Sequence, residues 1–194
     1  AAEPPPRRRV AEDSPRYGDP SKLSRDQIIR LIGDLDGELA RAGVKAELLM
    51  VGGAVMTIVF QAREQTKDVD AVFEPEQPVR DAVRRIAERE GLPEDWLNDA
   101  ARGFLAPAGQ FDPYFDGEGL RVFVASAEYV LAMKILAMRP EGVAPDQADI
   151  QFLCRYLGIT SAAAAMDIVE KYYPERRLTP RIRFGLEELL QADE

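Results

Sequence analysis

The apolar pattern of this chain changes near Ala125, and that change constrains the fold more than any other feature of the sequence. Before Ala125, short apolar runs of the kind that forms buried strands alternate with stretches whose apolar residues recur at helical spacing. After Ala125, every apolar stretch has helical spacing. We therefore predict an α+β fold in which a small mixed sheet is flanked by helices and followed by a C-terminal helical bundle.

The same pattern divides the chain into three predicted parts. Residues 1–22 contain a proline run and an arginine run but few apolar side chains, which is typical of a flexible arm. Residues 23–125 form the predicted core, and its first helix begins with a capping box made by Ser24 and Gln27. Residues 126–194 form a predicted helical subdomain. Its helices are expected over 126–139, 145–157, 161–172 and 180–191.

Within the core part, Gly43 marks the end of the first helix. Further helices are predicted over 54–61, 78–90 and 94–102, and strands over 47–51, 68–73 and 120–124. Trp96 lies in the third of these helices, where it either packs into the core or stacks on a base.

Histidine is absent from the chain, which excludes Ser/His and Cys/His nucleophiles and every zinc site that uses histidine. The single cysteine, Cys154, lies on an apolar helix face and has no partner for an internal disulfide, so a reducing cytoplasm fits the chain best. The apolar runs are too short to span a bilayer, and we expect no membrane partner.

The formal net charge of -9 argues against a uniformly basic surface that coats nucleic acid. A local basic run nevertheless follows residue 170, with five Lys or Arg and one acidic residue between Lys171 and Arg183. That run is either a solvated helix face or an electrostatic footprint for RNA.

Asp68 and Asp70 are two residues apart on a predicted strand, so both side chains point to the same side. Two carboxylates that share a site repel each other unless a cation lies between them. Oxygen ligands favour Mg²⁺ or Mn²⁺, which also bind phosphate oxygens. The alternative is that the two aspartates are exposed acids at the end of a strand.

Gly52 and Gly53 follow the strand 47–51 and precede a helix. Glycine lets backbone N–H groups approach a phosphate closely, although a Gly-Gly pair is also found in ordinary tight turns. The order of strand, Gly-Gly turn, helix and paired aspartates predicts that a phosphate cradle and metal ligands lie together on adjacent strands.

This combination resembles the polymerase-beta-like nucleotidyltransferase superfamily, whose minimal site is a Gly-Gly or Gly-Ser turn followed by paired aspartates on the next strand. The closer resemblance, over residues 47–158, is to the AbiE-type branch, which includes MenT-type toxins and related uncharacterised bacterial nucleotidyltransferases. That branch has a Gly-Gly motif, an Arg-x-x-Thr-x-Asp-x-Asp motif, a helical lysine and a later acidic motif. The similar residues here are Gly52 and Gly53, then 63–70, then Lys134 with Ala137 and Arg139, then Asp146 and Asp149.

The resemblance implies a nucleotidyltransferase fold and a site for an NTP. It implies catalytic roles for Asp68, Asp70, Lys134, Asp146 and Asp149, metal binding by Asp68 and Asp70, and nucleotide binding by Gly52, Gly53, Arg63, Thr66, Lys67 and Arg139. From the residues alone, Lys134 is either a fixed charge for a triphosphate or a lysine at a helix edge. Asp146 and Asp149 share a helix face, where they orient Lys134, act as a base, or simply complement the helix dipole.

We therefore expect a metal-dependent enzyme that moves a nucleoside monophosphate from an NTP to an acceptor hydroxyl. By resemblance to MenT-type toxins, the acceptor is the 3′ end of tRNA, and a cognate antitoxin protein is a possible partner. The predicted strand 120–124 carries Arg121 and no carboxylate, so the metal is held by two acids and phosphate oxygens, or activity has been lost. The alternatives are a non-catalytic nucleotide- or protein-binding module of the same fold, and transfer to a protein or small molecule.

Overall fold

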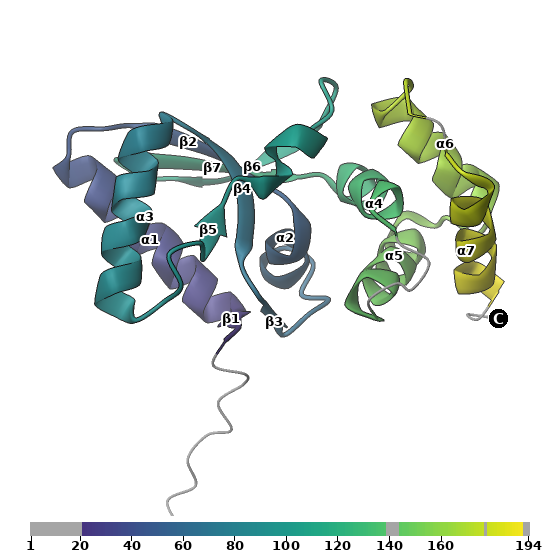
Figure 1. Cartoon of the computed structure of the whole chain (residues 1–194), viewed down its shortest axis with the longest axis horizontal. Helices are drawn as coiled ribbons and strands as arrows, with labels where there is room; N and C mark the ends of the chain where they lie inside the picture. Colours follow the sequence, from purple (N-terminus) through teal and green to yellow (C-terminus); the bar gives the residue numbers. More distant parts are fainter. Residues whose placement is uncertain (1–20, 139–143, 177, 192–194) are drawn as a thin grey trace, which may run out of the picture.

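The computed structural model describes residues 21–138, 144–176 and 178–191 and has an α+β fold, as predicted (Figure 1). The elements up to Ala125 mix strands and helices. In chain order they are β1 (Leu23–Ser24), α1 (Arg25–Arg41), β2 (Ala46–Met50), α2 (Gly52–Ile58), β3 (Gln65–Thr66), β4 (Val69–Glu74), α3 (Glu76–Glu90), β5 (Leu97–Asn98), the 3₁₀ helix η1 (Ala100–Phe104), β6 (Phe111–Asp116) and β7 (Leu120–Ala125).

The main sheet has five strands in the order β5-β4-β2-β7-β6. It is mixed, because β2 runs parallel to β7 but antiparallel to β4, while β4 runs parallel to β5 and β6 antiparallel to β7. The short strands β1 and β3 form a separate antiparallel pair. The predicted mixed sheet flanked by helices is thus confirmed.

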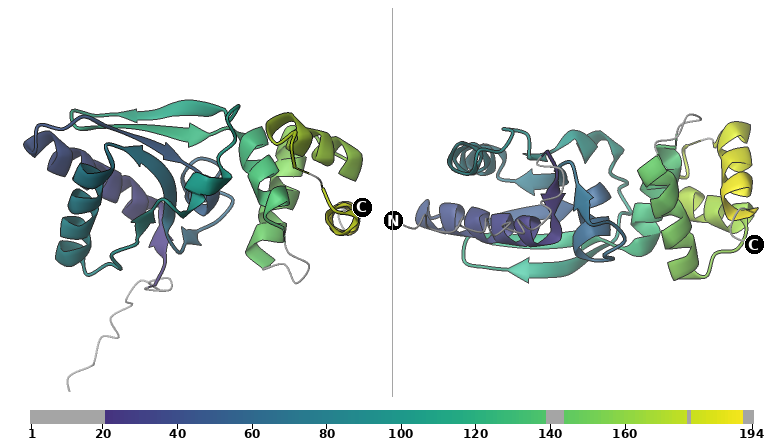
Figure 2. Two further views of the ribbon diagram at one scale, coloured as in Figure 1. Left: turned by 45° about the horizontal axis from the view of Figure 1, so that its top comes forward. Right: turned by 90° about the horizontal axis from the view of Figure 1, so that it is seen from below.

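One face of the sheet is covered by α1 and α3, which lie side by side and contact β7 and β4 respectively (Figures 1 and 2). Alternate residues of the three central strands are buried on one face: Ala46, Leu48, Met50, Val69, Ala71, Phe73, Leu120, Val122 and Val124. Burying each large apolar side chain contributes roughly 1.5–3 kcal/mol to stability. Because strand residues alternate between faces, Asp70, between Val69 and Ala71, points to the opposite face.

The predicted helix over 94–102 is wrong. The segment instead pairs with β4, where Leu97 lies opposite Val69 and Asn98 lies opposite Asp70, and η1 follows. Trp96 is buried, and its indole N–H donates to the carbonyl of Val83 at 3.2 Å. Tertiary pairing and burial of the indole have overridden the local helical pattern.

Strand β6 was not predicted, because its sequence lacks a clear alternation and contains Pro113. The structure places it at the edge of the sheet, with a register shift between Pro113 and Phe115, where a missing N–H is tolerated. Helix α2 begins at Gly52 and ends at Ile58, so it lies earlier in the chain than the predicted helix over 54–61.

After Ala125 the described elements are all helices, as the pattern predicted. They are α4 (Ala127–Leu136), α5 (Ala144–Leu157), α6 (Ala162–Tyr172) and α7 (Pro180–Gln191). Helix α4 contacts α5 and α6, and Figure 2 shows this group beyond one end of the sheet. Cys154 is buried on α5. The three-part division of the chain stays a prediction, and most of its proposed arm, residues 1–20, lies outside the described residues.

In the described part of the chain, no helix taken singly has the length and apolar character to cross a membrane. One pair, Asp146–Leu157 with Ala162–Tyr172, meets the length and composition criteria together but is bent by 95° at its break.

Candidate functional site

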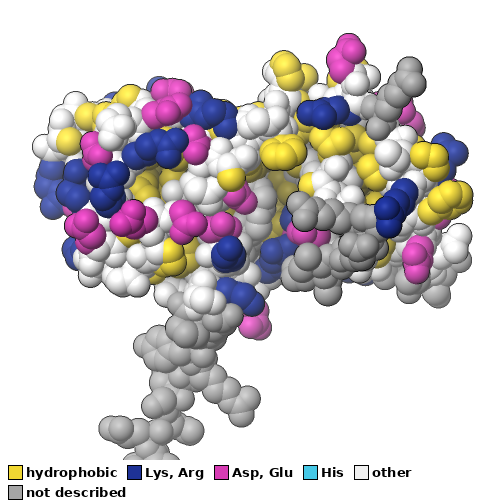
Figure 3. Space-filling model, viewed as in Figure 1, with side chains coloured by type: hydrophobic (Ala, Val, Ile, Leu, Met, Phe, Trp, Pro, Cys, Tyr) yellow, Lys and Arg dark blue, Asp and Glu magenta, His cyan; other side chains and the backbone are white. Residues whose placement is uncertain are grey.

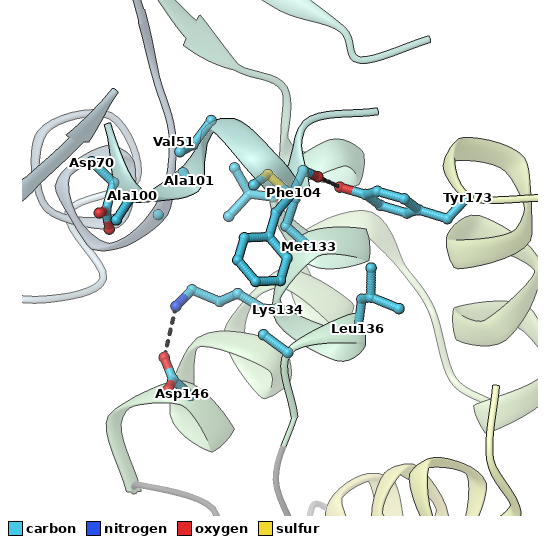
Figure 4. Close-up of a pocket in the computed structure, with 13 residues that line it drawn as sticks. Val51, Asp70, Ala100, Ala101, Phe104, Met133, Lys134, Leu136, Asp146 and Tyr173 are labelled. Carbon is cyan, nitrogen blue, oxygen red and sulfur yellow. Dashed lines mark hydrogen bonds and ion pairs between the residues drawn. The ribbon is translucent and has the colours of Figure 1, made fainter. Parts of the chain in front are cut away.

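A cavity of about 270 Å³ lies where the sheet meets the C-terminal helices (Figure 4). Its polar side chains are Asp70, Lys134 and Asp146. The remaining lining residues come from the turn after β2, from η1, from α4 and from the end of α6; they are Val51, Gly52, Ala100, Ala101, Phe104, Val130, Met133, Leu136, Ala137 and Tyr173. All four predicted site motifs therefore contribute a residue to one cavity: the Gly-Gly motif, the segment with the paired aspartates, the helical lysine and the later acidic motif.

Gly52 and Asp70 are in close contact. A Cβ atom added to Gly52 would lie 3.0 Å from Oδ2 of Asp70, and Gly52 has a φ of +68°, which disfavours other residues. The two segments are also joined by a hydrogen bond of 2.9 Å from the N–H of Val51 to the carbonyl of Asp70. The glycine at this turn thus lets the backbone of β2 pack against the carboxylate.

Asp68 lies close enough to Asp70 to influence the ionisation of Asp70. Burial raises the pKa of both carboxyls, and the charge of Asp68 raises the pKa of Asp70 further, while Lys134 acts in the opposite direction. Asn98 donates to Oδ2 of Asp68 at 3.3 Å. The pair is therefore a site at which a bound cation would relieve both desolvation and repulsion.

The carboxylate oxygens of Asp68 and Asp70 suit Mg²⁺ or Mn²⁺ if only a few of the metal's ligands come from the protein. No group of three or more Asp, Glu, Cys or His side chains that could hold a metal occurs among the described residues. Strand β7 carries Arg121 and no carboxylate, and Arg121 forms an ion pair with Glu47. Since Mg²⁺ is commonly bound through one or two carboxylates together with substrate phosphates, Asp68 and Asp70 suit it.

Four charged residues form a second group, the site cluster, composed of Arg63, Lys134, Asp146 and Asp149. The guanidinium of Arg63 donates from Nε to Oδ1 of Asp149 at 2.7 Å and from Nη2 to Oδ2 of the same carboxylate. The Nζ atom of Lys134 lies 2.8 Å from both Asp146 and Asp149. The side chain of Asp149 is only 2% exposed, and its charge is compensated by two cations from different parts of the chain.

Asp146 is the more exposed carboxylate of the site cluster. Its burial opposes ionisation, but the hydrogen bond from Lys134 and the charges of Lys134 and Arg63 outweigh that effect and lower the pKa of Asp146. A carboxylate with a lowered pKa is a weak base. Of the predicted roles for Asp146 and Asp149, the geometry therefore favours orientation of Lys134.

Some of the other predicted nucleotide-binding residues lie beside the Gly-Gly turn and others do not. Gly53 packs against Thr66, since an added Cβ would lie 2.5 Å from its Oγ1 and 3.3 Å from Nη1 of Arg63. Thr66 is buried and Lys67 is exposed. Arg63 and Thr66 thus lie beside the Gly-Gly turn, while Arg139 lies outside the described residues.

Comparison of the chain with protein-family models, with curated proteins and with solved structures gives no match.

Three site residues were missed by the sequence analysis: Asn98, Phe104 and Tyr173. Asn98 orients Asp68, and its own amide oxygen accepts the N–H of Ala100 at 3.0 Å. The hydroxyl of Tyr173 donates to the carbonyl of Phe104 at 2.7 Å. No local pattern marks these residues, because each acts through a partner distant in the chain.

Proposed function

We propose that the chain is a metal-dependent nucleotidyltransferase of the polymerase-beta-like type. The observation that carries this proposal is the packing of Asp70 against Gly52 in a cavity that also contains Lys134. Acids that suit a divalent cation, a glycine turn that admits a phosphate, and a lysine at the cavity are the elements that phosphoryl-type transfer requires.

In this reaction the acceptor hydroxyl oxygen forms a bond to the α-phosphorus of the NTP, the bond to pyrophosphate breaks, and the hydroxyl proton is released. Asp68 and Asp70 would hold Mg²⁺ or Mn²⁺, which supplies charge neutralisation for the phosphates. Lys134 lies at the same cavity and is held in one orientation by Asp146 and Asp149, so it offers a fixed positive charge for the triphosphate.

We propose the 3′ end of tRNA as the acceptor, on the resemblance to MenT-type toxins, with a toxin–antitoxin role and a cytoplasmic location. The exposed side chains of Arg181 and Arg183 on α7 support an electrostatic footprint for RNA. A protein or small-molecule acceptor, and a binding module without turnover, are the outcomes against which the experiment below discriminates.

The test is incubation of the purified chain with each labelled NTP, Mg²⁺ and total RNA, followed by separation of the labelled products. We expect label in a tRNA-sized band, complete loss of label with a chelator, and a loss of about 100-fold or more in Asp70→Asn. Asp112→Asn, which changes an exposed aspartate on β6, is the matched control and should retain activity.

Two results would contradict the proposal. Labelling by Asp70→Asn at the wild-type rate would show that Asp70 is not part of the active site. Nucleotide binding without pyrophosphate release would favour the non-catalytic module. Label recovered in protein or in a small molecule would keep the enzyme and change its acceptor.

A further inference from the structure

The cavity also contains an aromatic side chain, Phe104, to which the proposed reaction assigns no role. Phe104 lines it at the end of η1, and its side chain is 55% exposed although it is large and apolar. Figure 4 shows Phe104 among Met133, Leu136 and Tyr173, with Lys134, Asp146 and Asp70 at the polar part of the same space. An exposed aromatic ring inside a pocket indicates contact with a ligand more than a single apolar residue on an open surface does.

Phe104 is held in position by its backbone. Its carbonyl accepts the hydroxyl of Tyr173, which joins η1 to the end of α6. At the other end of η1, Asp99 is paired with Arg80 at 2.7 Å and with Arg102 at 3.3 Å. The segment that presents the ring is therefore fixed at both ends before any ligand arrives, which lowers the entropic cost of using it.

We propose that the Phe104 ring is the stacking platform for the nucleobase of the bound nucleotide, an inference that rests on the proposed function. The cavity joins a polar part, formed by Asp70, Lys134 and Asp146, to an apolar part, and a nucleotide has the same division between its phosphates and its base. Stacking on an aromatic ring uses the π-face that every base possesses, so Phe104 contributes affinity for purines and pyrimidines alike.

The experiment is an equilibrium titration with a Mg²⁺-bound ATP analogue that has a methylene group between its α- and β-phosphorus atoms, so that no turnover occurs. We expect Phe104→Ala to bind about tenfold more weakly than wild type and Phe104→Trp to bind at least as tightly. Inorganic tripolyphosphate, which has no ring, should bind wild type and Phe104→Ala equally. Phe184→Ala is the matched control, because Phe184 is 67% exposed on α7 and does not line the cavity.

The outcomes separate this inference from the function on which it rests. Equal binding of the ATP analogue by wild type and Phe104→Ala would overturn the platform and leave the nucleotide site intact. An equal weakening of tripolyphosphate in Phe104→Ala would also overturn it, because the substitution would then have altered the polar part of the cavity. A wild-type chain that binds neither compound would overturn both proposals.

Discussion

Among the described residues, two of the clusters of charged side chains differ in burial. The surface cluster joins α1 to α3 and consists of Arg30, Asp34, Glu38, Arg85, Arg89 and Glu90. Its cations are largely exposed, Arg89 at 45%, and Figure 3 shows Lys, Arg, Asp and Glu gathered over this part of the molecule. In the site cluster, by contrast, the Lys134 side chain is 10% exposed and that of Asp149 is 2% exposed, and Asp146 is its one member that is more than half exposed. Exposed pairs are screened by water and salt, whereas removing one member of a buried group leaves a charge without compensation.

The difference indicates what each cluster contributes. The surface cluster crosses between two helices that already pack through their apolar faces, so its ion pairs add little to stability. The site cluster joins Arg63, before the sheet strand β4, to Asp149 on α5 and fixes Lys134 at the cavity. Its charges therefore matter both to the joining of the two parts of the chain and to the proposed chemistry.

The largest expected effect on stability is that of Asp149→Asn. This substitution removes the buried carboxylate that Arg63 and Lys134 share and leaves them only the exposed carboxylate of Asp146, and we expect the free energy of unfolding to fall by about 3–5 kcal/mol. Urea denaturation at neutral pH measures the change. Asp146→Asn is the control on the same helix, since Asp146 contacts the same two cations but is 54% exposed, and it should cost at most about 1 kcal/mol. Equal losses in the two variants would break the distinction between buried and exposed charges.

A second contrast concerns two glycines, one at the site and one on the surface. A Cβ at Gly53 would meet Oγ1 of buried Thr66 at 2.5 Å, and the β-branched threonine has little freedom to turn away. We expect Gly53→Ala to lower the free energy of unfolding by about 1–3 kcal/mol. Gly33→Ala, on the exposed side of α1 with no heavy atom within 4 Å, should instead raise it by about 0.5–1 kcal/mol. Thermal denaturation of both variants tests the opposite signs, and a stabilising Gly53→Ala would contradict the close packing at the turn.

The features predicted correctly from the sequence are those encoded by neighbouring residues. The capping box of Ser24 and Gln27 is present in both directions, and the helical spacing after Ala125 corresponds to four helices. The placement of Asp70 beside Gly52 agrees with the order of motifs along the chain. Asp70 lies in β4 and Asp68 immediately precedes that strand, and the charge of Asp68 acts on Asp70.

The features missed depend on partners distant in the chain. Residues 97–98 are a strand only because β4 lies beside them, and nothing in the local pattern marks that pairing. The sequence analysis also did not predict the ion pair of Arg63 with Asp149, 86 residues later, while nucleotide binding by Arg63 stays a prediction. Phe104 lines the cavity, and Tyr173, which binds its carbonyl, comes from another part of the fold. Such contacts are set by tertiary packing, which the spacing of residues in one sequence does not specify.

The smallest expected effect is that of Glu38→Gln in the surface cluster, where Glu38 is itself 14% exposed but its partners Arg85 and Arg89 are 49% and 45% exposed. Burial opposes the ionisation of Glu38, but the hydrogen bonds from Arg85 and Arg89 and the charge of Arg41 outweigh it and lower the pKa of Glu38. A carboxyl whose pKa is lower in the folded state stabilises the fold above its unfolded pKa and loses that contribution as the pH falls through the folded value. Glu38→Gln should therefore cost at most about 1 kcal/mol at pH 7, and the difference from wild type should shrink below about pH 4 and in about 1 M NaCl. Urea denaturation under these three conditions measures it. A loss as large as that of Asp149→Asn would show that exposure does not separate the two clusters. A loss that persists in acid would show that the charge of Glu38 is not its cause.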